Sequence, residues 1–189
     1  MLSDARLDWQ FAALEIAMIE QVNRNIPIAQ QQHCGDWTVF IESGAVAEAP
    51  GRHCAISQTQ FDMDTCRRVL SIELFPENDG LRGALVLPDG LLRQDGVILQ
   101  CDGAAPGPVL PFSTTTRLGC IVELNLGAGM IASLQYAHGL YVKAVSVETG
   151  SEEIFPISLN GFFTALNLAL SLSSSRAVTN GKAPSLPFR

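Results

Sequence analysis

The chain has 189 residues, of which 47% are apolar and 16% charged, and its formal net charge is −7 at pH 7. This length fits one domain with a terminal extension, and the composition excludes a disordered chain and disfavours a nucleic-acid partner, because carboxylates repel a phosphate backbone. The longest apolar run, residues 162–172, is about half the ~20 residues that cross a bilayer, so no membrane span is predicted.

The first predicted element is an amphipathic helix that precedes the β-rich part of the chain. Apolar residues recur there at steps of three and four, which places them on one helical face, and Pro27 ends the pattern. We predict that residues 1–34 form this helix and a linker, and that the helix packs on its own domain or on a partner chain. The apolar face comprises Leu7, Phe11, Leu14, Met18 and Val22.

The same segment does not resemble a secretory signal. Acidic residues, at positions 4, 8, 15 and 20, interrupt the stretch that would have to be uncharged, and no basic region precedes it. On this ground alone the predicted location is the cytoplasm.

From Gly35 onward, short runs of β-branched and aromatic residues alternate with turn residues. The period of two is clearest over residues 69–74, and Asp-Gly pairs such as Asp89-Gly90 mark the turns, because glycine adopts a positive φ without strain. The pattern predicts an antiparallel β-sandwich of about eight strands over residues 35–173. The predicted strands are Trp37–Glu42, Cys54–Gln60, Arg68–Phe75, Gly83–Leu87, Val97–Cys101, Cys120–Leu126, Leu140–Glu148 and Glu153–Leu159.

A short helix is predicted after the last strand. It begins near Ser158 or Asn160 and places Phe162, Leu166 and Leu170 on one face, so we expect it to seal one end of the sandwich. Residues 174–189 are polar and rich in turn formers, and they are predicted to form a flexible tail.

One glycine-containing segment resembles a nucleotide-binding fingerprint. Gly127, Gly129 and Ala132 follow a predicted strand, and Glu148 ends the next strand, where it could hold a ribose. The segment comes late in a β-rich chain, however, and has room for only a short helix, so a capped helix between two sandwich strands is favoured. Gly127, Gly129 and Glu148 are weak cofactor-binding candidates, and no cofactor is predicted.

The chain has five cysteines and no Cys-x-x-Cys spacing of the kind that holds zinc. The dipeptides His33-Cys34 and His53-Cys54 could each offer two soft ligands, but one such pair makes an incomplete site, so no metal is predicted. Cysteine–histidine catalysis would need an orienting third group and a thiol of lowered pKa. With no other catalytic motif in the sequence, we expect a protein that is not an enzyme.

Six pieces of sequence, in order, resemble the invasion-associated locus B family. They begin with Gly35-Asp36-Trp37-Thr38-Val39 and end with Ser158-Leu159-Asn160-Gly161-Phe162 before Ala165-Leu166, so the resemblance covers residues 35–172. Between these lie Arg68-Val69-Leu70-Ser71-Ile72-Glu73, Leu87-Pro88-Asp89-Gly90-Leu91, Gly96-Val97-Ile98-Leu99-Gln100 before Asp102-Gly103, and Pro111-Phe112 followed by Gly119-Cys120.

The resemblance implies an exported β domain, periplasmic or at the cell surface, that is linked with host-cell invasion and offers no catalytic residues to transfer. It also implies cysteines at two positions where this chain has Ile41 and Thr115, whereas their apparent partners, Cys54 and Cys120, are present. The disulfide pattern of the family is therefore broken here.

Strand register limits which bridges could replace the lost ones. If position 41 faces Cys54 in an antiparallel pair, position 34 faces 61, and Cys34 then lies about 23 Å along the strand from position 41, too far to bridge Cys54. Bridges are expected only among Cys34, Cys66, Cys101 and Cys120, with Cys34–Cys66 the favoured pair and Cys54 free.

The favoured hypothesis is a non-enzymatic cell-envelope protein that binds a partner through its sandwich surface or N-terminal helix. Two alternatives stay open. One is a cytoplasmic relative that forms homodimers through the N-terminal helix, which the broken disulfide pattern and the missing signal support. The other is a nucleotide-dependent function at Gly127–Ala132.

Overall fold

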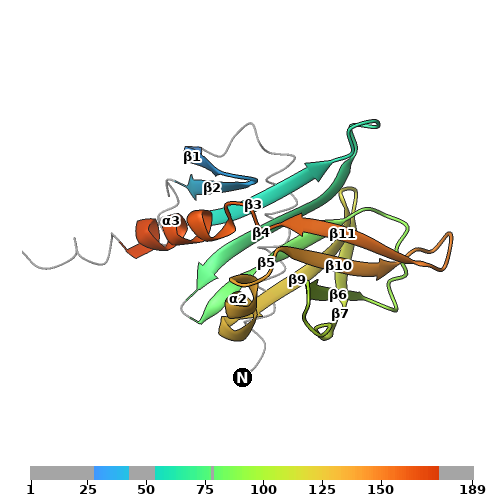
Figure 1. Cartoon of the computed structure of the whole chain (residues 1–189). Helices are drawn as coiled ribbons and strands as arrows, with labels where there is room; N and C mark the ends of the chain where they lie inside the picture. Colours follow the sequence, from blue (N-terminus) through green and yellow to red (C-terminus); the bar gives the residue numbers. More distant parts are fainter. Residues whose placement is uncertain (1–27, 43–53, 78, 175–189) are drawn as a thin grey trace, which may run out of the picture.

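The computed structural model describes residues 28–42, 54–77 and 79–174. The predicted N-terminal helix, His53 and the tail from residue 175 onward lie outside the described residues. Within them, the chain forms two antiparallel sheets and two helices, which confirms a mostly-β fold (Figure 1). The strands are β1 (Ile28–Cys34), β2 (Trp37–Glu42), β3 (Cys54–Phe61), β4 (Arg68–Glu77), β5 (Gly80–Leu87), β6 (Val97–Cys101), β7 (Val109–Leu110), β8 (Phe112–Thr116), β9 (Gly119–Gly127), β10 (Gly139–Val145) and β11 (Glu152–Ser158), and the helices are α2 (Ala128–Leu134) and α3 (Phe162–Ser174).

The larger sheet has seven strands in the order β1-β2-β3-β4-β5-β9-β8. Its strands alternate as the sequence period predicts: Leu70, Ile72 and Leu74 of β4 are buried, whereas Ser71 and Glu73 are only partly covered. One face of this sheet, the inner face, therefore carries most of the core.

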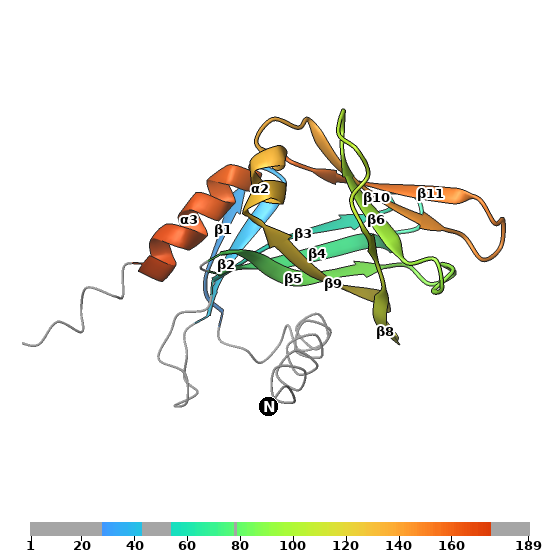
Figure 2. The same cartoon turned by 90° about the horizontal axis from the view of Figure 1, so that it is seen from below.

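The smaller sheet has four strands in the order β11-β10-β6-β7. Figure 2 shows this sheet and both helices on the same side of the larger sheet, so together they cover its inner face. Val142 of β10 and Ile157 of β11 are almost completely buried against Ile56, Leu85 and their neighbours in one continuous core cluster.

The two helices close the part of the inner face that the small sheet leaves uncovered. Helix α3 buries Phe162, Ala165, Leu166 and Ala169, a three- and four-residue spacing that forms one apolar stripe, and it contacts β1 to β4. Helix α2 packs on β9 through its buried Leu134. Neither described helix is long and apolar enough to cross a membrane.

The first strand corrects the sequence analysis, which predicts a linker before residue 35. Strand β1 pairs with β2 from Ile28↔Glu42 to Cys34↔Trp37, so the chain reverses at Gly35-Asp36. Its polar run, Gln30–Gln32, is exposed because β1 is an edge strand of the large sheet, and the sequence therefore lacks the apolar alternation of a half-buried strand. The sequence analysis also does not predict β7, which has only two residues, or β8, which is mostly polar.

Two segments from opposite ends of the chain meet at the β1–β2 turn. The Trp37 indole Nε1 donates to the carbonyl of Ser158 at 2.8 Å, and its ring packs edge-on against Phe162 with centroids 4.9 Å apart. The Ser158 hydroxyl donates to Asp36 at 2.6 Å, and the Asp36 amide donates to the Asn160 carbonyl at 3.1 Å. The first and last pieces of the family resemblance thus form one structural junction.

Candidate functional site

The outward face of the four-stranded sheet is the main candidate for a binding surface. Its side chains alternate with buried core residues along each strand, and cross-strand pairs bring Tyr141 opposite Pro156 and Lys143 opposite both Ile154 and Ile98. Ile154 is 52% exposed and Val109 is 57% exposed. We call this surface the small-sheet face; it comprises Ile98, Gln100, Val109, Tyr141, Lys143, Val145, Ile154 and Pro156.

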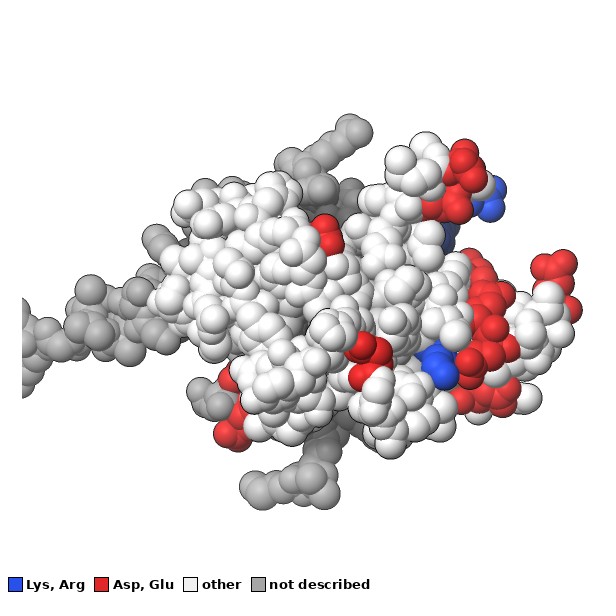
Figure 3. Space-filling view, viewed as in Figure 1, with Lys and Arg blue, Asp and Glu red and all other residues white. Residues whose placement is uncertain are grey.

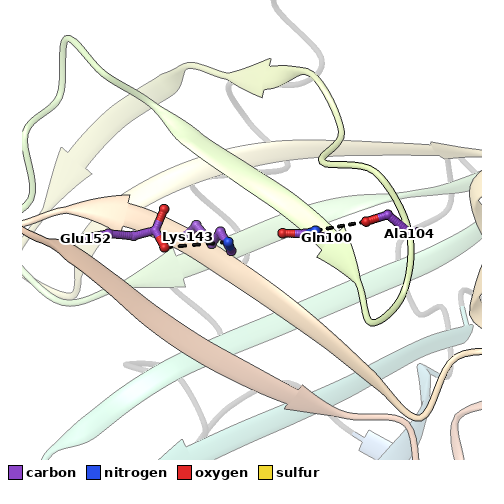
Figure 4. A network of polar contacts seen from close by, with 4 residues as sticks. All are labelled: Gln100, Ala104, Lys143 and Glu152. Atoms are coloured by element: carbon purple, nitrogen blue, oxygen red, sulfur yellow. Dashed lines mark hydrogen bonds and ion pairs between the residues drawn. The ribbon is translucent and has the colours of Figure 1, made fainter.

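Polar contacts hold two of the long side chains of this face in place (Figure 4). Lys143 Nζ lies 3.5 Å from Glu152 Oε1, and the Gln100 side-chain amide donates to the carbonyl of Ala104 at 2.8 Å. The ammonium of Lys143 is therefore neutralised within the sheet, and the apolar side chains beside it are left as the dominant contact surface.

One border of the small-sheet face is acidic. Glu148 is exposed and Glu153 is partly so, and they lie in the turn between β10 and β11 and in β11, next to Glu152, whose carboxylate pairs with Lys143. Figure 3 shows acidic side chains gathered at this end of the molecule. An apolar surface with a negative border favours a protein surface with an apolar centre and cationic residues at its edge.

The outer edge of β11 is partly closed by glutamines from β3. The Gln58 side chain donates to the Ser158 carbonyl at 3.0 Å and accepts from the Ser158 amide at 3.1 Å, while Gln60 donates to the Pro156 carbonyl at 2.8 Å. Because these main-chain groups are already paired, a partner would meet the face of this sheet rather than add a strand at β11.

A groove lies at the opposite end of the large sheet, between the β4–β5 turn and the two helices. It has a volume of about 570 Å³ and an apolar floor that includes Leu81, Ile131 and Leu166. Glu77 and Asp79 also line it, and Glu77 is ion-paired with Arg82 at 3.1 Å. The carboxylates disfavour a phosphate here, although Ala128 and Ala132 of the predicted nucleotide segment line the groove.

The structure does not bring the weak cofactor candidates together. Gly127 ends β9 in the large sheet, and Gly129 lies in α2, whereas Glu148 follows β10 in the small sheet. Helix α2 precedes β10 and Glu148 follows it, so the length of that strand, about 20 Å, separates them. A dinucleotide fingerprint needs both strands parallel in one sheet, an arrangement that β9 and β10 lack.

All five cysteines are free thiols in the structure, including the four expected to form any bridges. Cys34 is buried at the β1–β2 turn and Cys66 is exposed in the β3–β4 turn, so the favoured pair is not joined. The chain reverses at Gly35-Asp36, and Cys34 therefore faces Trp37 rather than residue 61.

Burial, followed by the negative charge of Asp102, raises the pKa of the Cys101 thiol, which makes it a poor nucleophile.

The side chains of the histidine–cysteine pair at the end of β1 lie in different surroundings. His33 is exposed, and its Nδ1 is 3.0 Å from the Thr38 hydroxyl, while Cys34 is buried in the core. Among the described residues, no three His, Cys, Asp or Glu side chains gather as metal ligands would.

The sequence analysis did not single out the residues of the small-sheet face. A signal was present: in β10 the buried set contains Leu140 and Val142, and two of the three residues that alternate with them, Tyr141 and Val145, are also aromatic or apolar, with Lys143 between them. When apolar residues occupy both odd and even positions of a strand, either both faces of the strand are buried or the solvent-facing side is a contact surface. The structure buries one set and leaves the other partly exposed.

Comparison with known proteins places this fold among relatives. The family model described as "Invasion associated locus B (IalB) protein" matches residues 37–169. An "Invasion protein B homolog" of Brucella abortus (strain 2308) is 33% identical over 144 residues, which span 76% of this chain and 80% of the relative, and a homolog from strain 9-941 matches equally. The crystal structure of invasion associated protein b from Bartonella henselae superposes with a TM-score of 0.69 at 23% identity, over 77% of this chain and 98% of that one.

Proposed function

Because this chain belongs to the invasion-associated locus B family, we propose that it is a non-enzymatic cell-envelope protein that binds a protein partner through its small-sheet face. The observation that carries the proposal is the outward exposure of Ile154 and Val109, which are 52% and 57% exposed on an otherwise well-formed sheet. They lie on the two edge strands of this sheet, at the ends of a cross-strand row in which Lys143 and Ile98 are the middle residues. Apolar side chains exposed over one face of a folded domain are typical of interaction surfaces.

The chemistry of the face selects the kind of partner. Tyr141 offers an aromatic contact of the kind that often supplies much of the binding energy of an interface, and Ile154 adds apolar contact area beside it. The border at Glu148 and Glu153 favours lysine or arginine at the rim of the partner. The partner is therefore a protein with an apolar centre and a basic rim.

Two observations support a binding role rather than catalysis. Four of the five thiols are buried, and that of Cys101 has a raised pKa. The groove lined by Leu81 and Leu166 carries two carboxylates, one of them in an ion pair with Arg82, and the described residues that line it include no cysteine, histidine or serine. The cell-envelope location rests on the family alone, so it needs its own test by fractionation of cells that make the native chain.

Site-specific photo-crosslinking tests the binding surface. A benzophenone amino acid is placed at Ile154 and, as a matched control, at Asn167, which is exposed on α3 away from this sheet. We expect an adduct with a second protein from position 154 and none from 167, and the crosslinked peptide of that protein should contain apolar residues beside lysine or arginine.

Binding to the identified protein then gives the quantitative test. Ile154→Lys replaces an apolar contact by a cation next to the border that the partner's basic rim faces, and we expect the Kd to rise at least ~10-fold, the effect of about 1.4 kcal/mol, while Asn167→Lys leaves it unchanged. An adduct of twice the chain's own mass would replace the partner by a second copy. Equal adduct yields from positions 154 and 167 would refute the small-sheet face as the binding surface.

A further inference from the structure

The edges of the two sheets differ in how far they are protected from pairing with another strand. In the part of the chain that the structure describes, β1 and β8 are the edge strands of the large sheet, and β11 and β7 are those of the small one. An edge strand presents unpaired amide and carbonyl groups, which bind a further strand unless a bulge, a proline, a charge or a covering segment prevents it.

Three of these edges offer little to a partner strand. Gln58 and Gln60 occupy main-chain groups of β11, and β7 has only two residues. Strand β8 has five residues, but it follows Pro111 and carries a bulge between Phe112 and Thr114. Prolines and bulges are both common means of protecting an edge.

Strand β1 lacks these protections over most of its length. Its seven residues include no proline, lysine, arginine or carboxylate, and its pairing with β2 is regular from Gln30 to Cys34. The side chains of Gln30, Gln31, Gln32 and His33 are exposed. Among the residues that the structure describes, only those of β2 form hydrogen bonds with these four. The outer edge of β1 is therefore accessible to another strand.

The β1–β2 hairpin determines which main-chain groups of β1 point outward. Its two-residue turn, Gly35-Asp36, joins Cys34 to Trp37, and a hydrogen bond between the two flanking residues closes such a turn. Hydrogen-bonded and non-hydrogen-bonded pairs alternate along antiparallel strands. Gln31, three positions before Cys34, therefore directs its amide and carbonyl groups away from β2.

Gln31 is also the midpoint of β1, which runs from Ile28 to Cys34. If two copies of β1 pair antiparallel about this residue, Gln31 faces its own counterpart and Gln30 faces Gln32, so the two strands overlap over their whole length. A glutamine amide both donates and accepts hydrogen bonds, so facing glutamines can satisfy one another. The strand is thus complementary to itself in its main chain and in its side chains.

The charge of the molecule also favours this edge for a contact between two copies. The chain has a net charge of −7, so a symmetric contact through the acidic border at Glu148 and Glu153 would bring like charges together. A symmetric contact through β1 brings together no pair of like charges, because the strand has no lysine, arginine or carboxylate.

We propose that β1 pairs antiparallel with β1 of a second copy, about a twofold axis at Gln31, and so joins two seven-stranded sheets into one continuous sheet. The observation that carries the proposal is the unprotected edge of β1, whose outward main-chain groups lie at its midpoint. The proposal does not rest on the small-sheet face, because β1 belongs to the other sheet.

Sedimentation equilibrium of the full chain tests the pairing. The wild-type mass should rise with concentration to twice the 20.3 kDa of one chain. Gln31→Lys places two ammonium groups opposite each other across the twofold axis, and we expect the Kd of the dimer to rise about 5-fold or more. Thr115→Lys is the matched control, since Thr115 is exposed on β8, the opposite edge of the same sheet, and its dimer should keep the wild-type Kd.

Mixing two variants tests the register of the pairing. Gln31→Lys and Gln31→Glu should each weaken the dimer alone, whereas an equimolar mixture should recover it, because residue 31 then faces an opposite charge. A wild-type mass of one chain at concentrations up to about 100 μM would overturn the proposal. So would a wild-type Kd in Gln31→Lys, an equal loss in Thr115→Lys, or a mixture no more dimeric than its components.

Discussion

Ile41 lies directly opposite Cys54 on neighbouring antiparallel strands, and both side chains are buried in the core. The family resemblance implies a cysteine at position 41, and the register confirms that such a cysteine would face Cys54. Thr115 lies opposite Cys120 in the same way, with its hydroxyl 4.0 Å from the thiol. This chain thus keeps the backbone geometry of two cross-strand bridges and one cysteine of each.

The first prediction follows from that register. Ile41→Cys should form a disulfide with Cys54 on oxidation, because paired residues on adjacent strands lie within the Cα separation that a disulfide needs. Closing the loop between these positions should make the oxidised variant about 3 kcal/mol more stable than its reduced form. Urea unfolding with and without reductant measures the difference.

Wild type is the control for this bridge, and its stability should not change with reductant, since all its thiols are free. The reduced variant should be about 1 kcal/mol less stable than wild type, because a smaller side chain replaces a buried isoleucine. Six titratable thiols in the oxidised, unfolded variant would show that the bridge does not form.

The second prediction concerns Gly161 at the junction with the β1–β2 turn. Its φ is +82°, and a Cβ there would collide with the carbonyl oxygen of Cys34. Gly161→Ala should therefore lower the free energy of unfolding by roughly 3 kcal/mol or more, the range of substitutions that strain the backbone and force a packed segment apart.

Gly150→Ala is the matched control, because Gly150 also has a positive φ, +65°, but nothing lies within 4 Å of an added Cβ. It should cost about 1–2 kcal/mol, the penalty of a left-handed conformation alone. Equal losses in the two variants, by denaturant unfolding, would mean that the close approach to Cys34 contributes nothing.

The third prediction tests the polar corner between the sheets. Gln58 is 4% exposed and pairs with both the amide and the carbonyl of Ser158. Gln58→Ala should destabilise the protein by about 2–3 kcal/mol, since it leaves main-chain groups at the edge of β11 without their partner. Thr59→Ala, at the next and exposed position, should change stability by about 0.5 kcal/mol or less. Similar values for the two would remove the structural role assigned to Gln58.

The fourth prediction is a pH dependence at Asp102. One carboxylate oxygen of Asp102 accepts hydrogen bonds from the amides of His138 and Gly139, each at 2.8 Å, and these bonds, that from Gly139 first, hold the pKa of Asp102 below its ordinary value. A carboxyl whose pKa is lowered on folding contributes stability above its unfolded pKa, and the contribution is lost as the pH falls through the folded pKa.

Asp102→Asn should therefore flatten the loss of stability on acidification below about pH 4. Unfolding midpoints between pH 6 and pH 2.5, compared among wild type, Asp102→Asn and the exposed turn variant Asp95→Asn, measure the effect. An acid dependence in Asp102→Asn as steep as in wild type would contradict this linkage.

The sequence by itself determined most strands and the alternation of their side chains. The pattern at Val69–Leu74 has the period of a strand, and Trp37–Glu42 and Val97–Cys101 have the same bounds in the sequence prediction and in the structure. These features are local: alternation follows from the backbone geometry of a strand, and glycine marks turns because it adopts a positive φ without strain. The 41–54 pairing required the family resemblance, and the register confirms it.

Tertiary structure alone decided which surfaces stay exposed and which distant residues meet. The polar strand β1 exists because it completes an edge of the large sheet, although its own sequence, Gln30–Gln32 included, has no half-buried alternation. Tyr141 and Ile154 face outward because the large sheet covers only the opposite side of β10 and β11. Glu148 is held away from Gly127 because consecutive strands enter different sheets. Local periodicity assigns residues to two faces, but only the packing of a second layer fixes which face is covered.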